Sequence, residues 1–147
     1  MGCVASQPLT ITVPGVPVAK GRARVALRGG RAMAYTPSKT RRYEDLIRLE
    51  GGRAMEGRAL LAGPLAVFVE AYLPIPKSFS KAKREAIERG DLFPSTRPDC
   101  DNYAKVIDGL NGVAWTDDAQ IVTLTVTKRY DERPRLQLQA WELDGCD

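Results

Sequence analysis

Histidine is absent from this chain of 147 residues. Its absence excludes the Ser-His-Asp and Cys-His mechanisms, histidine-ligated zinc and histidine as a general base. If the protein is an enzyme, carboxylates, lysine and a metal ion have to carry its chemistry.

Cysteine is scarce, and long apolar runs are missing. The three cysteines, Cys3, Cys100 and Cys146, are an odd number without metal-type spacing, which argues against a disulfide framework. No stretch of 18 apolar residues occurs, and no charged start is followed by an apolar run of signal-peptide length. We therefore expect a soluble, cytoplasmic protein that has no membrane partner.

The net charge is small, but the positive charge is unevenly placed. Lysine and arginine number 22 against 18 aspartates and glutamates, which gives a net charge of +4. Basic residues gather in the first third of the chain, at Lys20, Arg22, Arg24, Arg28, Arg31, Lys39, Arg41 and Arg42. Because the acidic residues cluster elsewhere, a polyanion could be held by one region and cut by another.

The basic stretch from Lys20 to Arg31 contains three glycines and little hydrophobic periodicity, so we expect a loop or an irregular hairpin. A flexible, solvated loop would explain its composition. The alternative is an arm that contacts phosphates, since Arg and Lys at loop positions can follow the regularly spaced charges of a nucleic-acid backbone. On that interpretation Lys20, Arg22 and Arg24 bind DNA, together with Arg97 from the connection before the acidic stretch.

Most of the candidate chemistry lies in Asp99 to Asp108 and in the Trp115-Thr116-Asp117-Asp118 that follows. At about 100° per residue, a helix places Asp101, Lys105 and Asp108 on one face. The opposite face is apolar and consists of Tyr103, Val106, Ile107 and Leu110. The sequence therefore predicts an amphipathic helix with a charged face.

A charged helix face is often only solvated surface, but this one starts with Asp-x-Asp and is followed by a second acidic pair. Carboxylates brought together raise one another's pKa, so a converging cluster usually needs a cation. Mg²⁺ prefers oxygen ligands and keeps several waters, so Asp99, Asp101 and one residue of the second pair suffice to hold it. If that pair is extended, Asp117 and Asp118 point to opposite faces and only one reaches the metal.

Three further polar residues lie in the same stretch. Lys105 follows Asp101 by one helical turn, where its ammonium could meet a phosphate oxygen or the charge that develops in the transition state. An i,i+4 ion pair with Asp101, worth about 0.3–0.5 kcal/mol at an exposed site, is the simpler interpretation and is compatible with the first. Asn102 and Asp108 are expected to support the carboxylates or to brace the helix.

The apolar pattern predicts an α+β fold, an α/β sandwich in which helices cover a mixed β-sheet within a single compact domain. Residues 1–8 are expected to be disordered and residues 9–147 to form the domain. Strands are predicted at 9–13, 65–73, 121–128 and 136–141, with 65–73 central and the last two paired as a hairpin. Helices are predicted from 36 to about 55, with a stop at Gly51-Gly52 as the alternative, and from 80 to 90.

Two segments of the chain resemble a known family. The string Pro98-Asp99-Cys100-Asp101-Asn102-x-x-Lys105-x-x-Asp108-Gly109-Leu110-Asn111-Gly112, with Asp117-Asp118-Ala119-Gln120-Ile121-Val122 after it, is similar to the signature of RusA-type Holliday junction resolvases. The segment Val13-Pro14-Gly15-x-Pro17-Val18-x-Lys20-Gly21-Arg22-x-Arg24, with Tyr35-Thr36-Pro37, resembles the amino-terminal segment of that family. Residues 53–93 carry no matching motif.

The resemblance implies an endodeoxyribonuclease that uses Mg²⁺, or Mn²⁺ in its place, to resolve four-way DNA junctions by paired, symmetric cuts in recombination and repair. It implies that Asp118 is the residue of the second pair that joins Asp99 and Asp101 at the metal, and that Lys105 is catalytic. Asp117 is expected to support them. A homodimer is expected, because one acidic cluster cannot cut two strands related by a two-fold axis at once. Such an enzyme would act at the nucleoid, or in a host cell if a phage encodes it.

Other functions compete with this one. An EF-hand is excluded by spacing, because Tyr103 and Ala104 stand where a ligand and a glycine belong. A metal-dependent transferase could use Asp-x-Asp to hold a nucleotide diphosphate, although the chain has no Gly-rich phosphate loop. A non-catalytic module that binds branched DNA is the other alternative, and the full set of carboxylates argues against it.

Overall fold

The computed structural model describes residues 7–21, 24–35 and 37–143. Most of the predicted disordered N-terminus lies outside these residues, as do Arg22, the side chain of Arg24, Cys3 and Cys146. Among the helices of the described part, none is long and apolar enough to cross a membrane.

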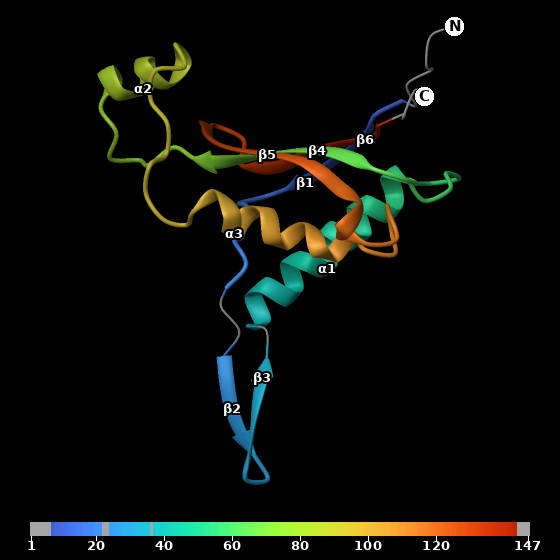
Figure 1. The fold of residues 1–147 in the computed structure, drawn as a ribbon. Helices are drawn as coiled ribbons and strands as arrows, with labels where there is room; N and C mark the ends of the chain where they lie inside the picture. The colour runs from blue at the N-terminus through green and yellow to red at the C-terminus, as the bar shows by residue number, and fades with distance from the viewer. Residues whose placement is uncertain (1–6, 22–23, 36, 144–147) are drawn as a thin grey trace, which may run out of the picture.

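Four strands form one mixed sheet (Figure 1). Their order across the sheet is β1 (Leu9–Pro14), β6 (Arg135–Glu142), β4 (Leu65–Pro74) and β5 (Ile121–Asp131). β6 runs antiparallel to both of its neighbours, and β5 runs parallel to β4. The predicted mixed sheet and α+β class are confirmed.

The predicted hairpin between the last two strands is wrong. β5 and β6 follow one another in the chain, but β4 lies between them in the sheet. Most side chains of β4 from Leu65 to Ala71 are buried, whereas β5 exposes Val122 and Leu124. A strand that is apolar on both faces buries more apolar surface between two neighbouring strands than at an edge. β4 therefore lies in the interior of the sheet and β5 at its edge.

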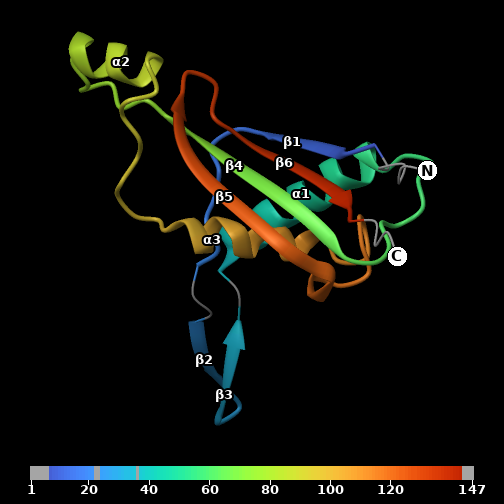
Figure 2. The same cartoon turned by 45° about the horizontal axis from the view of Figure 1, so that its top comes forward.

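Two helical segments cover one face of this sheet (Figures 1 and 2). One is α1 (Ser38–Ala54), and the other is α3 (Cys100–Ala104), which continues as the 3₁₀ helix η1 (Lys105–Leu110). The side chains between the sheet and these helices form one buried core. α2 (Lys81–Glu88) stands away from the sheet and begins after Ser80, as predicted, because the Ser80 hydroxyl accepts a hydrogen bond from the backbone N of Lys83 at 3.3 Å.

The first helix does not stop at Gly51-Gly52 but continues to Ala54. Gly51 lies where α1 packs on η1, and a Cβ at this position would be only 2.4 Å from Leu110 Cδ2. Gly109 of η1 approaches α1 in the same way, since a Cβ there would be 2.9 Å from the carbonyl oxygen of Glu44. The two glycines therefore set the distance at which the charged helix packs on α1.

Gly109→Ala is expected to lower the free energy of unfolding by about 1–3 kcal/mol, because the added methyl group overlaps a backbone carbonyl that has to move. Gly52→Ala is the matched control, since its Cβ meets open space on α1. Replacing that helical glycine should raise the free energy of unfolding by about 0.5–1 kcal/mol. Urea unfolding of both variants measures the difference, and equal stabilities would contradict the close approach.

A second, two-stranded sheet projects from the body of the molecule (Figures 1 and 2). In it β2 (Arg24–Arg28) pairs antiparallel with β3 (Arg31–Tyr35). Gly29 and Gly30 join the strands with φ values of 59° and 76°, as a type I′ turn requires. Of the two structures predicted for the basic stretch, the hairpin is therefore the one that forms, and its pairing is regular.

Candidate active site

The charged helix formed by α3 and η1 has the two faces that the sequence predicts. Its apolar residues, Tyr103, Val106, Ile107 and Leu110, are all buried in the core. Asp101 and Lys105 are exposed, and Asp108 is half-buried. Asp99 occupies the N-cap position of α3 without a side-chain hydrogen bond to the helix, so its carboxylate is not used as a cap.

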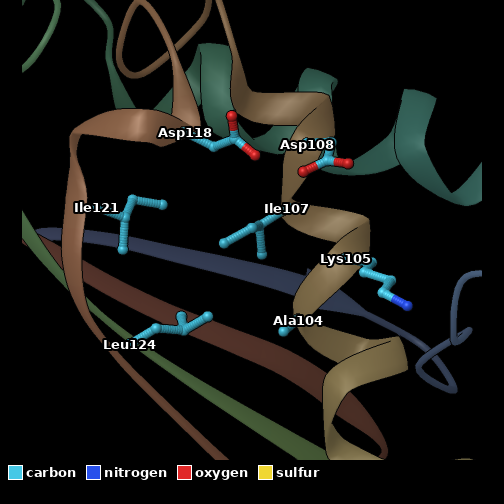
Figure 3. A pocket seen from close by; sticks show the side chains of 7 residues that line it. All are labelled: Ala104, Lys105, Ile107, Asp108, Asp118, Ile121 and Leu124. Atoms are coloured by element: carbon cyan, nitrogen blue, oxygen red, sulfur yellow. The ribbon is translucent and has the colours of Figure 1, made fainter.

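Lys105 and Asp101 form an ion pair on the exposed face, with Lys105 Nζ 3.7 Å from Asp101 Oδ2. The two side chains are 58% and 68% exposed, so the pair contributes only about 0.3–0.5 kcal/mol. Figure 3 shows the Lys105 side chain pointing away from Asp118. Its ammonium therefore remains accessible to a phosphate, and its catalytic role stays a prediction.

The loop that carries the second acidic pair is anchored in the core. Trp115 is fully buried, and its Nε1 donates a hydrogen bond to Asn111 Oδ1 at 2.8 Å. The loop ends in a short 3₁₀ helix, η2 (Asp118–Gln120), for which Asp117 is the N-cap. Oδ1 of Asp117 accepts a hydrogen bond from the backbone N of Ala119 at 3.0 Å, so this carboxylate is engaged in the turn.

Asp118 faces Asp108 across a surface pocket between η1 and the start of β5 (Figure 3). The other residues that line this pocket are Ala104, Lys105, Ile107, Ile121 and Leu124. Most of these are apolar, and charges beside apolar walls interact more strongly than they do in water. From the sequence we expected Asp108 only to support the metal-binding carboxylates or to brace the helix, although it lies on the same helix face as Asp101.

The two residues of the second acidic pair titrate differently. A hydrogen bond from the backbone N–H of Ala119 holds the pKa of Asp117 below its usual range. The pKa of Asp118 is raised, first by a hydrogen bond shared with Asp117 and then by slight desolvation and the nearby charge of Asp108. The argument that only one residue of this pair reaches the metal assumed an extended segment, and this condition is not met throughout, because Asp118 begins a 3₁₀ helix.

Lys20 lies between two carboxylates. Its Nζ is 3.3 Å from Glu44 Oε1 and 3.3 Å from Asp108 Oδ2. Burial lowers the pKa of Lys20, but hydrogen bonds and the charges of Asp108 and Glu44 raise it, and the net shift is upward. The ammonium is therefore charged beside the acidic residues, and its contact with DNA stays a prediction.

Asp99 lies in a second surface pocket at the entrance of the helix. Lys20, Arg97 and Asn102 line this pocket with it. The structure thus places two of the predicted DNA-binding residues beside a predicted metal ligand. A phosphate that reached Asp99 would meet both cations.

The structure does not gather Asp99, Asp101 and Asp118 at one point. Among the described residues, no group of three or more His, Cys, Asp or Glu side chains is arranged to hold a metal ion. Asp118 is brought to Asp108, while the other two lie at the helix entrance. The donor chemistry nevertheless fits Mg²⁺, which takes oxygen ligands and is usually held by one or two carboxylates and several waters.

Lys128 of β5 is a residue that the sequence pattern missed. Its Nζ donates hydrogen bonds to the carbonyl oxygens of Thr96 at 2.8 Å and Pro98 at 2.9 Å. These bonds tie the segment that leads into Asp99 to the edge of the sheet. A lysine near the end of a predicted strand carries no signal for such a distant contact, because the fold alone brings the two segments together.

Lys128→Met is expected to release the segment before Asp99, because methionine retains much of the side-chain length but donates no hydrogen bond. Hydrogen exchange at the backbone amides of residues 95–97 and of Asp99 should accelerate, and the free energy of unfolding should fall by about 1 kcal/mol. Lys77→Met removes a lysine from an exposed position and serves as the control. Unchanged exchange in residues 95–99 of the Lys128 variant would show that the two bonds do not hold this segment.

Comparison with known proteins identifies the family. Residues 14–140 match the family described as Endodeoxyribonuclease RusA. The chain is also similar to a protein of Bacillus subtilis (strain 168) named "Uncharacterized protein YqaN", with 38% identity over 140 residues that cover 93% of this chain and 98% of that protein. The family match includes the basic hairpin, the charged helix and the loop of Asp118. The protein therefore belongs to the RusA family of endodeoxyribonucleases, which are metal-dependent enzymes of the Holliday-junction-resolving type.

Proposed function

We propose that this protein is a Mg²⁺-dependent endonuclease that resolves four-way DNA junctions in recombination and repair by paired, symmetric cuts. The observation that carries the proposal is that Asp118 faces Asp108 (Figure 3). Asp108 lies on the charged helix, whose exposed face begins with Asp101. Membership in the RusA family supports the reaction class. Mn²⁺ is expected to substitute, because it accepts the same oxygen ligands.

The proposed metal ligands are Asp99, Asp101 and Asp118. Bound Mg²⁺ would lower the pKa of a water molecule and offset negative charge on the phosphate that is cut. Lys105 would contact an oxygen of that phosphate, and its ion pair with Asp101 would keep the ammonium in place before DNA arrives. The residues proposed to support these groups are Asn102, Asp108 and Asp117.

The contact between Asp118 and Asp108 favours a second ligand set, in which these two carboxylates hold the ion without Asp99. Titration of Mn²⁺ into the protein, followed by electron paramagnetic resonance, separates the two sets. Asp99→Asn weakens Mn²⁺ binding if the helix entrance supplies a ligand, and Asp108→Asn does so if the facing pair holds the ion. Binding that survives both changes and Asp118→Asn would remove the carboxylates from the metal site.

Four basic residues are proposed to hold the phosphates of the junction. Lys20 and Arg97 line the pocket that contains Asp99, and Arg22 and Arg24 follow Lys20 in the chain. Cations around an acidic site attract the DNA backbone, which the carboxylates alone would repel. The same region can therefore bind DNA and still place metal ligands against it.

The active form is proposed to be a homodimer. A four-way junction presents two strands related by a two-fold axis, and one chain offers a single acidic region, so a symmetric pair of chains matches the substrate. The proposed place of action is the cytoplasm, at the nucleoid of a cell or in the host of a phage.

A synthetic four-way junction and a linear duplex with the same arm sequences test this function. In Mg²⁺ the junction should be cut and the duplex left intact, and excess EDTA should stop the reaction. A junction that is bound but never cut in Mg²⁺ or Mn²⁺ would favour the non-catalytic module. Failure to bind or cut the junction would reject junction resolution altogether.

A further inference from the structure

The hairpin of β2 and β3 has two unlike faces. Directly opposed residues of an antiparallel pair lie on the same face. The register pairs Val25 with Ala34 and Leu27 with Ala32, so four apolar side chains share one face, which we call the apolar face. The opposite face, called the basic face, carries the pairs Ala26 with Met33 and Arg28 with Arg31.

The apolar face is exposed. Val25 and Leu27 are 68% and 79% exposed, and both alanines are exposed as well. Figures 1 and 2 show the hairpin projecting away from the sheet and the helices. A two-stranded hairpin is marginally stable on its own in water, and exposed apolar side chains grouped on a projecting arm indicate an interaction surface.

The chemistry of the apolar face does not match DNA. Arg28 and Arg31 flank the turn, and both belong to the basic face. The four residues of the apolar face include no cation that could contact a phosphate. Another protein surface is the better partner.

We propose that the apolar face packs against the same face of a second copy of this chain. The large side chains, Val25 and Leu27, lie on β2, and the alanines lie on β3. A two-fold axis parallel to the strands places β2 of one copy over β3 of the other. Because opposed residues lie at the same height along the hairpin, Leu27 then meets the partner's Ala32 and Val25 meets the partner's Ala34, so large side chains fill the space above small ones.

This pairing would be a contact within the homodimer of the proposed function. The role of the paired hairpins in binding DNA rests on that proposed function. The pairing turns the two basic faces outward on opposite sides of a four-stranded arm. Arg41 of α1 adjoins each basic face, where it lines a surface pocket with Ala26, Arg28 and Met33 of that face and with Ala34 and Tyr35. The arm would thus present cations to two DNA strands related by the same two-fold axis, as in a four-way junction.

Sedimentation velocity of the full chain at micromolar concentration tests the pairing. The wild-type protein should sediment as a dimer, and Leu27→Lys should shift it to a monomer because a charge is buried against the partner's alanine. Leu49→Lys makes the same chemical change at an exposed position on α1 and should leave the dimer intact. Thermal unfolding of the three proteins checks that the body of the molecule remains folded.

An exchange of side chains tests the fit directly. Leu27→Ala leaves a gap against the partner and Ala32→Leu creates an overlap, so each single change should weaken dimerisation about tenfold or more. The double variant Leu27→Ala/Ala32→Leu moves the large side chain across the hairpin and keeps large against small. Its dimer dissociation constant should therefore return to within about threefold of the wild-type value.

The outcomes separate this proposal from the proposed function. A wild-type monomer that cuts junctions would overturn both the pairing and the homodimer, but not the nuclease. A dimer that persists in Leu27→Lys would overturn the pairing through the hairpin and leave a dimer formed elsewhere. If that variant binds the junction more weakly but remains a dimer, the apolar face contacts DNA and not a second copy of the chain.

Discussion

Asp118→Asn is expected to lower the rate of junction cleavage by about 10³-fold or more, while the junction is still bound. Asparagine keeps the shape of the side chain but loses the charge that would hold a divalent ion. A loss of about 4 kcal/mol of transition-state stabilisation corresponds to that factor. Binding should be retained or strengthened, because the change removes a negative charge that faces phosphate. Single-turnover cleavage and gel-shift titration of the same junction measure the two effects.

Asp117→Asn is the matched control for this prediction. Asparagine is as good an N-cap as aspartate, so η2 should keep its structure while the same charge is lost one residue away. Cleavage by this variant should stay within about tenfold of the wild-type rate, as expected for a residue that acts only through its neighbour. Loss of activity in Asp117→Asn alone would reverse the roles of the pair, and wild-type activity in both variants would remove the pair from the site.

Trp115→Ala is expected to lower the free energy of unfolding by about 3–5 kcal/mol. Trp115 is one of the largest fully buried side chains, and its Nε1 supplies the hydrogen bond to Asn111 Oδ1. The truncation would leave a cavity and would remove the hydrogen-bond donor of Asn111 Oδ1, and both effects increase the loss of stability. Because Trp115 anchors the loop that carries Asp118, cleavage should also fall at temperatures where the variant remains folded.

Trp141→Ala provides the comparison for this stability prediction. Trp141 is only partly buried on β6 and packs edge-on against Phe68, with ring centroids 4.8 Å apart. Its truncation removes less buried surface, so the loss of stability should be clearly smaller, about 1–2 kcal/mol. Urea unfolding gives both values. Equal losses for the two tryptophans would show that Trp115 has no special part in the core.

The charged helix was predictable from sequence because its signal is local. Apolar residues at Tyr103, Val106, Ile107 and Leu110 recur at helical spacing, and the structure buries all of them. The same holds for the central strand β4, whose nearly continuous apolar run needs burial on both faces. The cap at Ser80 is also encoded within a few residues of itself.

Features that depend on distant contacts were not predictable in this way. β6 lies beside β4 because β4 is the strand that has to be covered on both sides. The prediction that β5 and β6 pair, which rested on their proximity in the chain, is wrong for this reason. Gly51 weakens a helix in isolation, yet here it permits the close packing of α1 on Leu110. The contact of Asp118 with Asp108 likewise arises only when the anchored loop folds back on η1.

We propose that the acidic face of the charged helix and Asp118 together make paired, metal-dependent cuts in a four-way junction. A junction whose two opposite strands carry different fluorophores tests it most directly. Mg²⁺ should produce cuts at symmetric positions in both strands within one complex, and EDTA or Asp118→Asn should abolish them. Cuts that appear in EDTA, or that persist in Asp118→Asn at the wild-type rate, would contradict it.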